Sequence, residues 1–456
     1  MKAAILAAGE GKRLGELTKE TPKPLVPVAG VPLICRVLRN LRGAGVTEAY
    51  VVIGYKGHKI QEEIGNNYAG VRIRYLENPY WQKGNLHSLL ILKGFLDENF
   101  LLCMSDHIFD DRMAKGLIHR DLKGVVMLVA EKRESPEDTK VLTEYDKILD
   151  IGKSIGKSVC VDTGLFLFSP GIFDYADQAA KEGKSELADC IRLAAEGGKA
   201  EVFYLSEIPS YVPGMRRDVD PFWFDVDKKD DIKYAKRILV KSAGKGASDF
   251  LAHYVHQFIE DKIVYHISDL KIITPNRLTI MTNIMAYCVT WLFLFGHLLT
   301  GSILAFMVGI MDGLDGKLAR VRGHISRLGS MEHPFDLLYE FSWFIALSLY
   351  VYWNSNSALP LIICTFIVIS IAFYRYCYDQ FRKAMGVSLD DYGKFERVFR
   401  RVAGRRNLYN ISILIGALLE IPLYSLIAIL AHAILTAIVY AFRAVKHMHD
   451  ADKLQF

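Results

Sequence analysis

The sequence of 456 residues has little that would cross-link it or direct it to secretion. Its seven cysteines are scattered without paired spacing, so we expect buried free thiols and neither a disulfide framework nor a zinc site. Met1–Ala8 is a short apolar stretch that runs at once into glycines and charge, so a cleavable signal peptide is not predicted. The net charge of +5 comes mostly from basic loops in the C-terminal half and calls for no nucleic-acid partner.

Long apolar runs are nearly absent from residues 1–270, which have the mixed charge of a soluble protein, but they dominate residues 278–443. A run of about 20 apolar residues is long enough to cross the hydrocarbon core of a bilayer. We therefore predict an all-α bundle of six transmembrane helices in the C-terminal half, of which the fifth is short. The predicted spans are 278–299, 301–320, 334–353, 357–378, 408–420 and 423–442.

Lysine and arginine are distributed unevenly among the connections between these spans. The connections HLLTG, WNSNSA and LEIPL contain neither, whereas basic residues fill the loops after the second and fourth spans and follow the sixth. Because basic loops stay on the cytoplasmic side of a membrane, this alternation places both termini in the cytoplasm. The sequence therefore predicts an integral protein of the cell membrane with a large cytosolic N-terminal domain.

The N-terminal half begins with a β-like run, Lys2–Leu6, followed by the glycine-rich and basic segment AAGEGKRLGELTKETPKPL. Gly9 and Gly11 allow a tight turn and a close approach of the backbone to phosphate. Lys12 and Arg13 supply positive charge, and Lys23 follows in PKPL. Further apolar runs alternate with helical patterns, which indicates an α/β sheet with its ligand at the carboxyl ends of the strands. These runs lie at 49–55, 99–106, 124–131 and 161–168.

Acidic residues follow two of the predicted strands. Asp106 comes directly after the run LLCM, and Asp225 and Asp227 lie in FWFDVDKKDD. An aspartate at the end of a strand often only caps a turn or a helix. Here the glycine-rich loop and Lys23 favour a metal site, because carboxylate oxygens suit Mg²⁺, which would bridge a triphosphate and leave diphosphate as the leaving group.

The order of the motifs LAAGEGKRL, PKPL, SDH, VDTG and FDVD resembles the nucleotidyltransferases that make sugar nucleotides and CDP-alcohols. This resemblance covers roughly residues 1–235 and implies a Rossmann-like α/β fold. It assigns the nucleotide phosphates to Gly9, Gly11 and Arg13, charge stabilisation at the α-phosphate to Lys23, and Mg²⁺ to Asp106 and Asp227.

The stretch ENPYWQKGNLHSLL resembles the part of the same family that contacts the base and the acceptor. On that ground Gly84, Asn85 and Ser88 are candidates for substrate binding. The alternative is a plain loop that leads into a helix, and the residues alone leave both interpretations open.

Residues 236–272 separate the two halves. Their Gly-, Ser- and Lys-rich start is typical of a linker. Beyond it, apolar residues recur at three- and four-residue steps from Phe250 to Ile259, which predicts an amphipathic helix that lies on the membrane surface or docks on the bundle. We therefore expect three parts: a cytosolic domain at 1–235, a linker with a juxtamembrane helix at 236–272, and a transmembrane domain at 273–456.

The second predicted span ends in MDGLDGKLAR, where carboxylates near hydrocarbon need a partner or a function. On a helix, Asp312, Asp315 and Gly316 share one face, because residues three and four apart are neighbours. Arginines suited to phosphate follow directly, namely Arg320, Arg322 and Arg327. The spacing predicts a site for cations and a phosphate group at the cytoplasmic end of this span.

A second set of acids, Glu332, Asp336 and Glu340, recurs every four residues at the start of the third span. Acids within a membrane can form salt bridges with loop arginines or line the ion path of a transporter. Acids on two successive helices at the same depth favour a dinuclear metal site instead.

The run DGLDGKLAR followed by Gly329 resembles the first half of the CDP-alcohol phosphotransferase signature, DxxDGxxAR-x8-GxxxDxxxD, and ITPNRLT resembles the entry motif of that family. The second half departs from the signature, because a strict count from Gly329 places His333 and Leu337 where aspartates are expected. We expect Glu332 and Asp336 to take their place, with Glu340 in reserve.

The resemblance to this family implies two cations, Mg²⁺ or Mn²⁺, at the pyrophosphate of a CDP-alcohol. It assigns the metal to Asp312, Asp315, Glu332 and Asp336, and substrate binding to Gly316, Arg320 and Arg327. It also makes Asp336 the base that deprotonates the acceptor hydroxyl, which attacks the β-phosphate while CMP leaves.

Both halves together resemble the bifunctional inositol-1-phosphate cytidylyltransferase and di-myo-inositol-phosphate-phosphate synthases. This implies that CTP and inositol 1-phosphate give CDP-inositol and diphosphate, and that phosphoinositol then passes to a second inositol 1-phosphate with release of CMP. It also implies a homodimer in a lipid bilayer. The basic stretch RVFRRVAGRR supplies charge suited to a phosphorylated acceptor, although positive-inside topology alone would also place arginines there.

Two other functions fit the same residues. The first is a phospholipid-synthesising CDP-alcohol phosphotransferase whose fused cytidylyltransferase acts on another alcohol phosphate. The second is an ion-coupled transporter with a regulatory nucleotide-binding domain. The sequence leaves the identity of the alcohol open, because specificity depends on the shape of a pocket.

Overall fold

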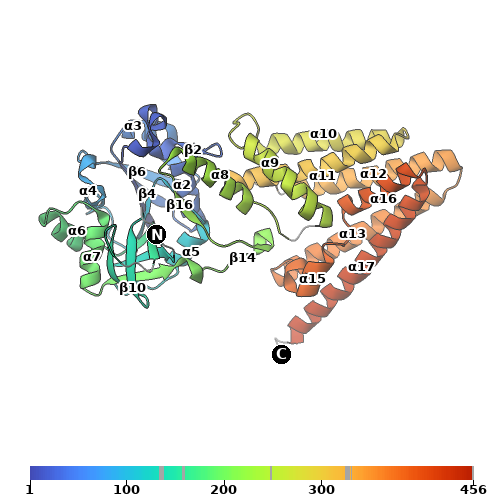
Figure 1. The fold of residues 1–456 in the computed structure, drawn as a ribbon. Helices are drawn as coiled ribbons and strands as arrows, with labels where there is room; N and C mark the ends of the chain where they lie inside the picture. The colour runs from blue at the N-terminus through green and yellow to red at the C-terminus, as the bar shows by residue number, and fades with distance from the viewer. Residues whose placement is uncertain (133–137, 157–159, 247–248, 324–328, 330, 454–456) are drawn as a thin grey trace. The chain divides into compact units, whose positions relative to one another are not determined.

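In the computed structural model (Figure 1), contacts divide the chain into two compact units. The first comprises Met1–Ser210 and Val219–Ile238, and the second comprises Tyr211–Asp218 and Leu239–Phe456. The structure describes the chain apart from residues 133–137, 157–159, 247–248, 324–328, 330 and 454–456. Helix α8 (Lys229–Ser242) runs through the predicted boundary at residue 235, and the three predicted parts remain a prediction.

A ten-stranded mixed sheet forms the core of the first unit, in the order β10-β11-β13-β9-β12-β7-β1-β4-β6-β5. Its centre is parallel, because β1 (Lys2–Ala7) pairs with β4 (Glu48–Ile53) on one side and with β7 (Phe100–Met104) on the other. The predicted apolar runs are thereby confirmed as strands, including β9 (Val126–Glu131) and β12 (Cys160–Phe168). The other strands are β5 (Asn67–Tyr68), β6 (Val71–Glu77), β10 (Lys140–Glu144), β11 (Lys147–Gly152) and β13 (Ala200–Tyr204).

Helices cover both faces of this sheet. Alternate residues of β1 point to opposite sides, so Ala3 and Ile5 belong to one apolar core and Ala4 and Leu6 to another. The first core is closed by α2 (Leu33–Gly43), α3 (Gly57–Ile64) and α5 (Asp111–Ile118). The second is closed by α4 (Asn85–Ile91), α6 (Ile172–Lys181) and α7 (Leu187–Glu196). The predicted α/β fold of the N-terminal half is confirmed.

The second unit is helical, and a helix covers most of each of the six predicted spans. Short helices α14 (Leu389–Tyr392) and α15 (Lys394–Phe399), which we did not predict, lie in the basic connection after the fourth. The six helices are α10 (Pro275–Leu294), α11 (Leu298–Val321), α12 (Glu332–Ser355), α13 (Leu359–Met385), α16 (Arg406–Leu418) and α17 (Pro422–Lys453).

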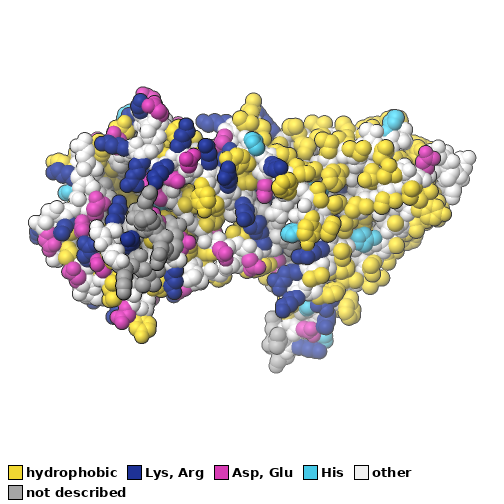
Figure 2. Space-filling view, viewed as in Figure 1, with side chains coloured by type: hydrophobic (Ala, Val, Ile, Leu, Met, Phe, Trp, Pro, Cys, Tyr) yellow, Lys and Arg dark blue, Asp and Glu magenta, His cyan; other side chains and the backbone are white. Residues whose placement is uncertain are grey.

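Within the described residues, four of these helices are long and apolar enough to cross a membrane: α10, α11, α13 and α17. Helix α16 has 13 residues, which span only about 20 Å, and the first turns of α12 contain three acidic residues. Apolar side chains cover much of the surface of the helices of the second unit, whereas the first unit carries mixed charge (Figure 2). The apolar helices indicate association with a membrane, and the number of six spans stays a prediction.

The predicted amphipathic helix forms as a π-helical turn, Ala252–His256, that continues into α9 (Gln257–Ile267). One face of it docks on α11, because a side chain added at Gly309 would contact His256 and one added at Gly313 would overlap the Glu260 carboxylate. The aromatic rings of Phe250, Tyr254 and Phe258 are exposed. Of the two predicted arrangements, docking on the bundle is therefore present in the structure.

Candidate active sites

A buried lysine lies among three carboxylates at the carboxyl edge of the sheet in the first unit. The ammonium nitrogen of Lys23 is 2.6 Å from Oδ2 of Asp106, 2.7 Å from Oδ1 of Asp227 and 3.5 Å from Oδ1 of Asp225. Asp106 follows the end of β7, and Asp225 ends the short strand β16 (Trp223–Asp225). The structure therefore brings together the lysine and the acids that the sequence placed in separate motifs.

The glycine-rich loop is shaped to receive this lysine. Gly11 has a φ of 70°, a left-handed conformation that favours glycine, and a Cβ there would lie 2.7 Å from Cβ of Lys23. Arg13, expected to bind phosphate, forms an ion pair with Asp227. The loop thus packs directly against Lys23, and Arg13 contacts the same acidic group.

The charged groups at this site shift one another's pKa values. Burial opposes the charge on Lys23, but the nearby Asp106 and Asp225 outweigh it and raise the lysine pKa above its ordinary value. Burial also works against ionisation of Asp106 and Asp227, yet Lys23 holds the pKa of both below the usual range. Burial and the neighbouring Asp106 raise the pKa of Asp225 to about 6. Lys23, Asp106 and Asp227 are therefore charged at neutral pH.

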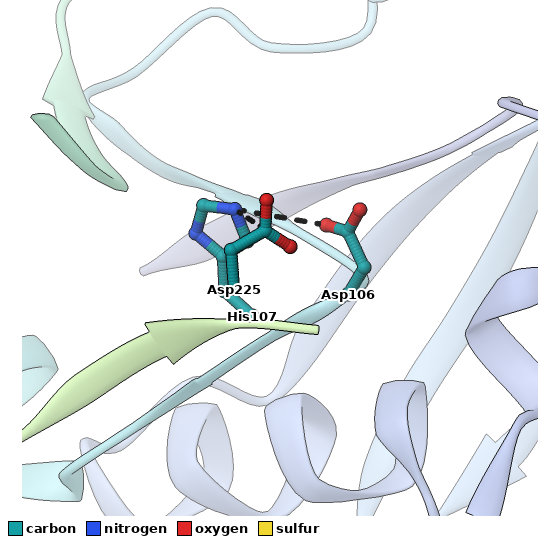
Figure 3. Close-up of side chains that lie close together, drawn as sticks. All are labelled: Asp106, His107 and Asp225. Carbon is teal, nitrogen blue, oxygen red and sulfur yellow. Dashed lines mark ion pairs between the residues drawn. The ribbon is translucent and has the colours of Figure 1, made fainter. Parts of the chain in front are cut away.

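A second grouping shares two of these acids. Asp106, His107 and Asp225 each offer one ligand atom, and the three atoms lie within 4.8 Å of one another (Figure 3). Oδ1 of Asp225 is buried and accepts no hydrogen bond within the described part of the chain, although the Lys23 ammonium forms an ion pair with it at 3.5 Å. Such an oxygen beside other acids fits a bound cation. The family resemblance assigns the metal to Asp227 rather than Asp225 and gives His107 no role, although His107 lies within the SDH motif.

Two cavities meet at Asp106. One of about 340 Å³ is lined by Gly9, Gly11, Lys23 and also by the three candidates Gly84, Asn85 and Ser88. Asn85 also has a structural role, because its side-chain oxygen accepts a hydrogen bond from the backbone of Leu187 at 2.6 Å. Ser88 is buried and accepts one from Asn78 at 2.9 Å. These residues therefore line a cavity and also shape the start of α4.

The other cavity, of about 590 Å³, contains an acid that sequence reasoning missed. Asp162 lies in the VDTG motif, where its Oδ1 accepts a hydrogen bond from the backbone N–H of Gly164 at 2.7 Å. Burial raises the pKa of Asp162 to about 6. The same cavity is lined by Asp138, Lys153 and Glu186. Arg13 also lines this cavity, so the wall combines several oxygen acceptors with the cationic side chains of Arg13 and Lys153.

In the second unit, Asp312 and Asp315 lie on α11, as predicted, and both already have partners. Asp312 Oδ2 lies 2.7 Å from Nη2 of Arg406, at the start of α16. Asp315 is buried and accepts a hydrogen bond from the hydroxyl of Thr279 on α10. The basic stretch before α16 thus reaches the acids of the DGLDG motif.

The acids of α12 are placed differently from one another. Asp336 is half-buried in the first turns of the helix. Glu340 is almost fully buried and pairs with Arg375 of α13 at 2.9 Å, so the salt-bridge interpretation applies to this residue. The backbone of Glu332 begins α12, but its side chain lies outside the described residues, as does the whole of Arg327.

Gly316 and Arg320, expected to contact substrate, lie one turn apart on α11. Nε of Arg320 donates a hydrogen bond to the backbone carbonyl of Ala243 at 2.7 Å. A Cβ on Gly316 would lie 3.1 Å from Nη1 of Arg320. This arginine is therefore held against the helix by a backbone carbonyl, and the absence of a side chain at Gly316 makes room for it.

The fold of the first unit and the motifs of both units define a two-domain transferase. The chain matches the Nucleotidyl transferase family over residues 2–242 and the CDP-alcohol phosphatidyltransferase family over residues 272–438. Enzymes of the second family generally use a divalent metal.

Relatives named "Bifunctional IPC transferase and DIPP synthase" match both parts together. The one from Aquifex aeolicus is 31% identical over 76% of this chain and 77% of its own. The one from Archaeoglobus fulgidus is 29% identical over 92% of this chain and 79% of its own. The chain belongs to this family of bifunctional transferases, as the order of its motifs predicted.

Among solved structures, the fold of the first unit is similar to the inositol-1-phosphate CTP transferase from T. maritima. The match has a TM-score of 0.43 and 24% identity, and it covers 50% of this chain and 90% of that chain.

Proposed function

We propose that this chain makes CDP-inositol and diphosphate from CTP and inositol 1-phosphate in its first unit. Its second unit then transfers phosphoinositol from CDP-inositol to a second inositol 1-phosphate and releases CMP. The observation that carries the proposal is the match of both units, in one chain, to relatives named for both activities. The two groups of acids with a basic partner, Lys23 in one and Arg406 in the other, support a phosphate chemistry in each unit.

In the first reaction, Lys23 is the cation that stabilises charge at the α-phosphate when the acceptor phosphate attacks. Its burial strengthens this effect, because a charge acts more strongly where water is excluded. Gly9 and Gly11 let the backbone approach the nucleotide phosphates, and Arg13 binds them from the side. Asp106 and Asp227, with Asp225 beside them, would hold Mg²⁺, which when bound neutralises the triphosphate and favours diphosphate as the leaving group.

The cavity of about 590 Å³ is the proposed site for the alcohol phosphate. Inositol presents hydroxyl groups around its ring, and Asp138, Asp162 and Glu186 are acceptors for them. Lys153 in the same wall suits the phosphate group. The cavity of about 340 Å³, with Gly84, Asn85 and Ser88, is then the proposed site for the cytidine.

In the second reaction, Asp312, Asp315 and Asp336, with Glu332, would hold the divalent cations that neutralise the pyrophosphate of CDP-inositol. Asp336 takes the proton from the attacking hydroxyl. Gly316 leaves space for the phosphates, and Arg320 and Arg327 bind them. Positioning and neutralisation of charge account for catalysis of this kind.

The proposed setting is a bilayer crossed six times by a homodimeric protein, with both termini in the cytoplasm. Helices α12 and α16 then add two spans to the four candidates. The lack of Lys and Arg in HLLTG, WNSNSA and LEIPL supports this topology.

The test follows both products from CTP, Mg²⁺ and inositol 1-phosphate with the full chain in detergent or vesicles. We expect diphosphate, CMP and a water-soluble phosphodiester. Asp312→Asn should abolish CMP release and spare diphosphate release, whereas Asp106→Asn should abolish diphosphate release and spare CMP release from supplied CDP-inositol. A lipid product would instead support a phospholipid synthase, and ion flux without CMP would support a transporter.

A further inference from the structure

His107 is held beside the acids of the first unit by its strand and by a glycine. It begins β8 (His107–Phe109), which pairs antiparallel with β16, and His107 lies directly opposite Asp225 in that register. Residues opposite each other on neighbouring strands bring their side chains together. Gly164 has a φ of 72°, and any side chain there would overlap the imidazole, so the ring fits against bare backbone. The indole of Trp223 lies on it with ring centres 5.8 Å apart.

The two ring nitrogens of His107 have different surroundings. Nδ1 lies 2.8 Å from the backbone carbonyl of Thr163. A carbonyl only accepts hydrogen bonds, so Nδ1 carries the hydrogen and donates it. Nε2 is left on the side of the ring that faces the carboxylates (Figure 3). This arrangement of a histidine, with one nitrogen donating to a carbonyl and the other turned to an acidic site, is typical of metal ligands.

The distances from Nε2 suit a shared cation better than hydrogen bonds. Nε2 is 3.8 Å from Oδ1 of Asp106 and 3.8 Å from Oδ1 of Asp225. A hydrogen bond would need about 3 Å, whereas neighbouring ligands of one divalent transition metal, with bonds of about 2.1 Å, lie roughly 3.0–3.6 Å apart, which is closer to the separations seen here. Lys23 contacts Asp106 through the other oxygen, Oδ2, at 2.6 Å. Oδ1 of Asp106 therefore remains turned toward the histidine.

From this geometry we propose that His107 is a metal ligand of the first unit through Nε2, with Asp106 and Asp225. The inference rests on the proposed function, because it concerns the cation of the cytidylyltransferase reaction. Mg²⁺ favours oxygen ligands, whereas imidazole nitrogen suits borderline cations such as Mn²⁺ and Co²⁺. A site with one nitrogen and two carboxylate oxygens selects Mn²⁺ over Mg²⁺, so His107 sets the metal preference of this site.

Two substitutions test the roles of the two ring nitrogens of His107 separately. In His107→Asn the side-chain NH₂ takes the place of Nδ1, which keeps the donor to Thr163 and removes the ligand. In His107→Gln the amide can place its oxygen where Nε2 was, which converts the site to oxygen ligands. Both are made in the full chain carrying Asp312→Asn and Asp315→Asn, so that Mn²⁺ bound in the second unit does not contribute.

The measurement is Mn²⁺ binding without nucleotide, followed by electron paramagnetic resonance, with Mg²⁺ as competitor. We expect pulsed spectra of the chain with His107 to show ¹⁴N coupling from one bound imidazole. His107→Asn should lose that coupling and bind Mn²⁺ about tenfold more weakly, and His107→Gln should shift the preference toward Mg²⁺. Absence of imidazole coupling in the chain with His107, or an unchanged Mn²⁺ to Mg²⁺ preference in His107→Asn, would overturn the inference.

Asp106→Asn separates this inference from the proposed function. If Asp106→Asn abolishes Mn²⁺ binding while the chain with His107 shows no imidazole coupling, the acids hold the cation and the role of His107 is wrong. If Asp106→Asn leaves Mn²⁺ binding unchanged, the proposed metal site of the first unit is wrong, and the role of His107 is wrong with it.

Discussion

Arg406 and Asp312 form an ion pair in the second unit, with Nη2 of the arginine 2.7 Å from Oδ2 of the aspartate. The same guanidinium donates to the hydroxyl of Tyr339 and lies over its ring, 4.8 Å from the centre. Lys23 makes an equivalent contact with Asp106 in the first unit, at 2.6 Å. In each unit a basic side chain therefore neutralises a carboxylate that the proposed function assigns to a cation. Under the proposed function, we expect both basic groups to turn from the carboxylate to a phosphate when substrate brings its own charge and cation.

Arg406→Lys should lower CMP release by about 100-fold and leave diphosphate release unchanged. Lysine keeps the charge but lacks the planar fork that contacts Asp312 and Tyr339 together. The measurement is CMP release from supplied CDP-inositol and inositol 1-phosphate. Arg401→Lys is the matched control, because Arg401 lies in the same basic stretch and its side chain is exposed. Equal losses in both variants would show that only the overall charge of the stretch matters.

Lys23→Gln should abolish diphosphate release and make the stability of the first unit depend on divalent cations. Removing the lysine leaves Asp106, Asp225 and Asp227 without their buried partner, which typically costs a protein about 3–5 kcal/mol. A divalent cation would then replace the lost charge. We expect Mg²⁺ or Mn²⁺ to raise the Tm of Lys23→Gln by more than it raises the Tm of the native chain. An equal shift in both proteins would mean that Lys23 does not compete with the cation.

Patterns along the sequence were sufficient to predict those features that neighbouring residues determine. The apolar run of β1 and the spacing of Asp312 and Asp315 on one helical face both follow from local geometry. The glycine-rich loop and Lys23 also came together as their order implied, because the loop follows the first strand directly. These features were predictable without knowledge of long-range contacts.

Contacts set by strand register or by packing between distant helices could not be predicted in the same way. His107 meets Asp225 only because β8 pairs with β16, and nothing local distinguishes Asp225 from Asp227. Glu340 was a candidate ligand by spacing, but its depth in the bundle pairs it with Arg375. A buried position of this kind depends on tertiary packing, which a pattern on one helix does not report.

Asp162→Asn should stabilise the first unit at neutral pH and weaken the use of inositol 1-phosphate. Burial raises the pKa of Asp162 from 3.8 to about 6, so the folded chain binds this proton more tightly than the unfolded chain. Stability from this group is therefore lost as pH rises from about 4 to 6, and the cost above pH 7 is on the order of 3 kcal/mol. Asparagine keeps the acceptor for Gly164 N–H without the charge.

The check on Asp162 is the difference in Tm between Asp162→Asn and the native full chain as a function of pH. We expect a higher Tm for the variant at pH 7–8 and no difference near pH 4. The same variant should show a raised KM for inositol 1-phosphate with the KM for CTP unchanged. A difference in Tm that does not vary with pH would contradict the assignment of this pKa.

Gly313→Ala should impair transfer in the second unit through the juxtamembrane helix. Any side chain at Gly313 would overlap the carboxylate of Glu260, which lies 3.7 Å from the buried ammonium of Lys317. The Glu260 carboxylate would have to turn away from α11, next to Asp312, and would leave Lys317 less well paired, which is costly for a buried charge. We expect CMP release to fall at least about tenfold, with diphosphate release unchanged.

Relief of the clash distinguishes this cause from a general effect of alanine in the helix. Glu260→Ala removes the carboxylate, while Asp261 still pairs with Lys317. When both substitutions are made, the methyl group introduced by Gly313→Ala therefore meets no obstacle. The double variant should therefore release CMP faster than Gly313→Ala alone. Two independent losses would instead make the double variant slower than either single variant. If the two losses simply add, the close approach of Glu260 to Gly313 is not what positions α9 against the DGLDG motif.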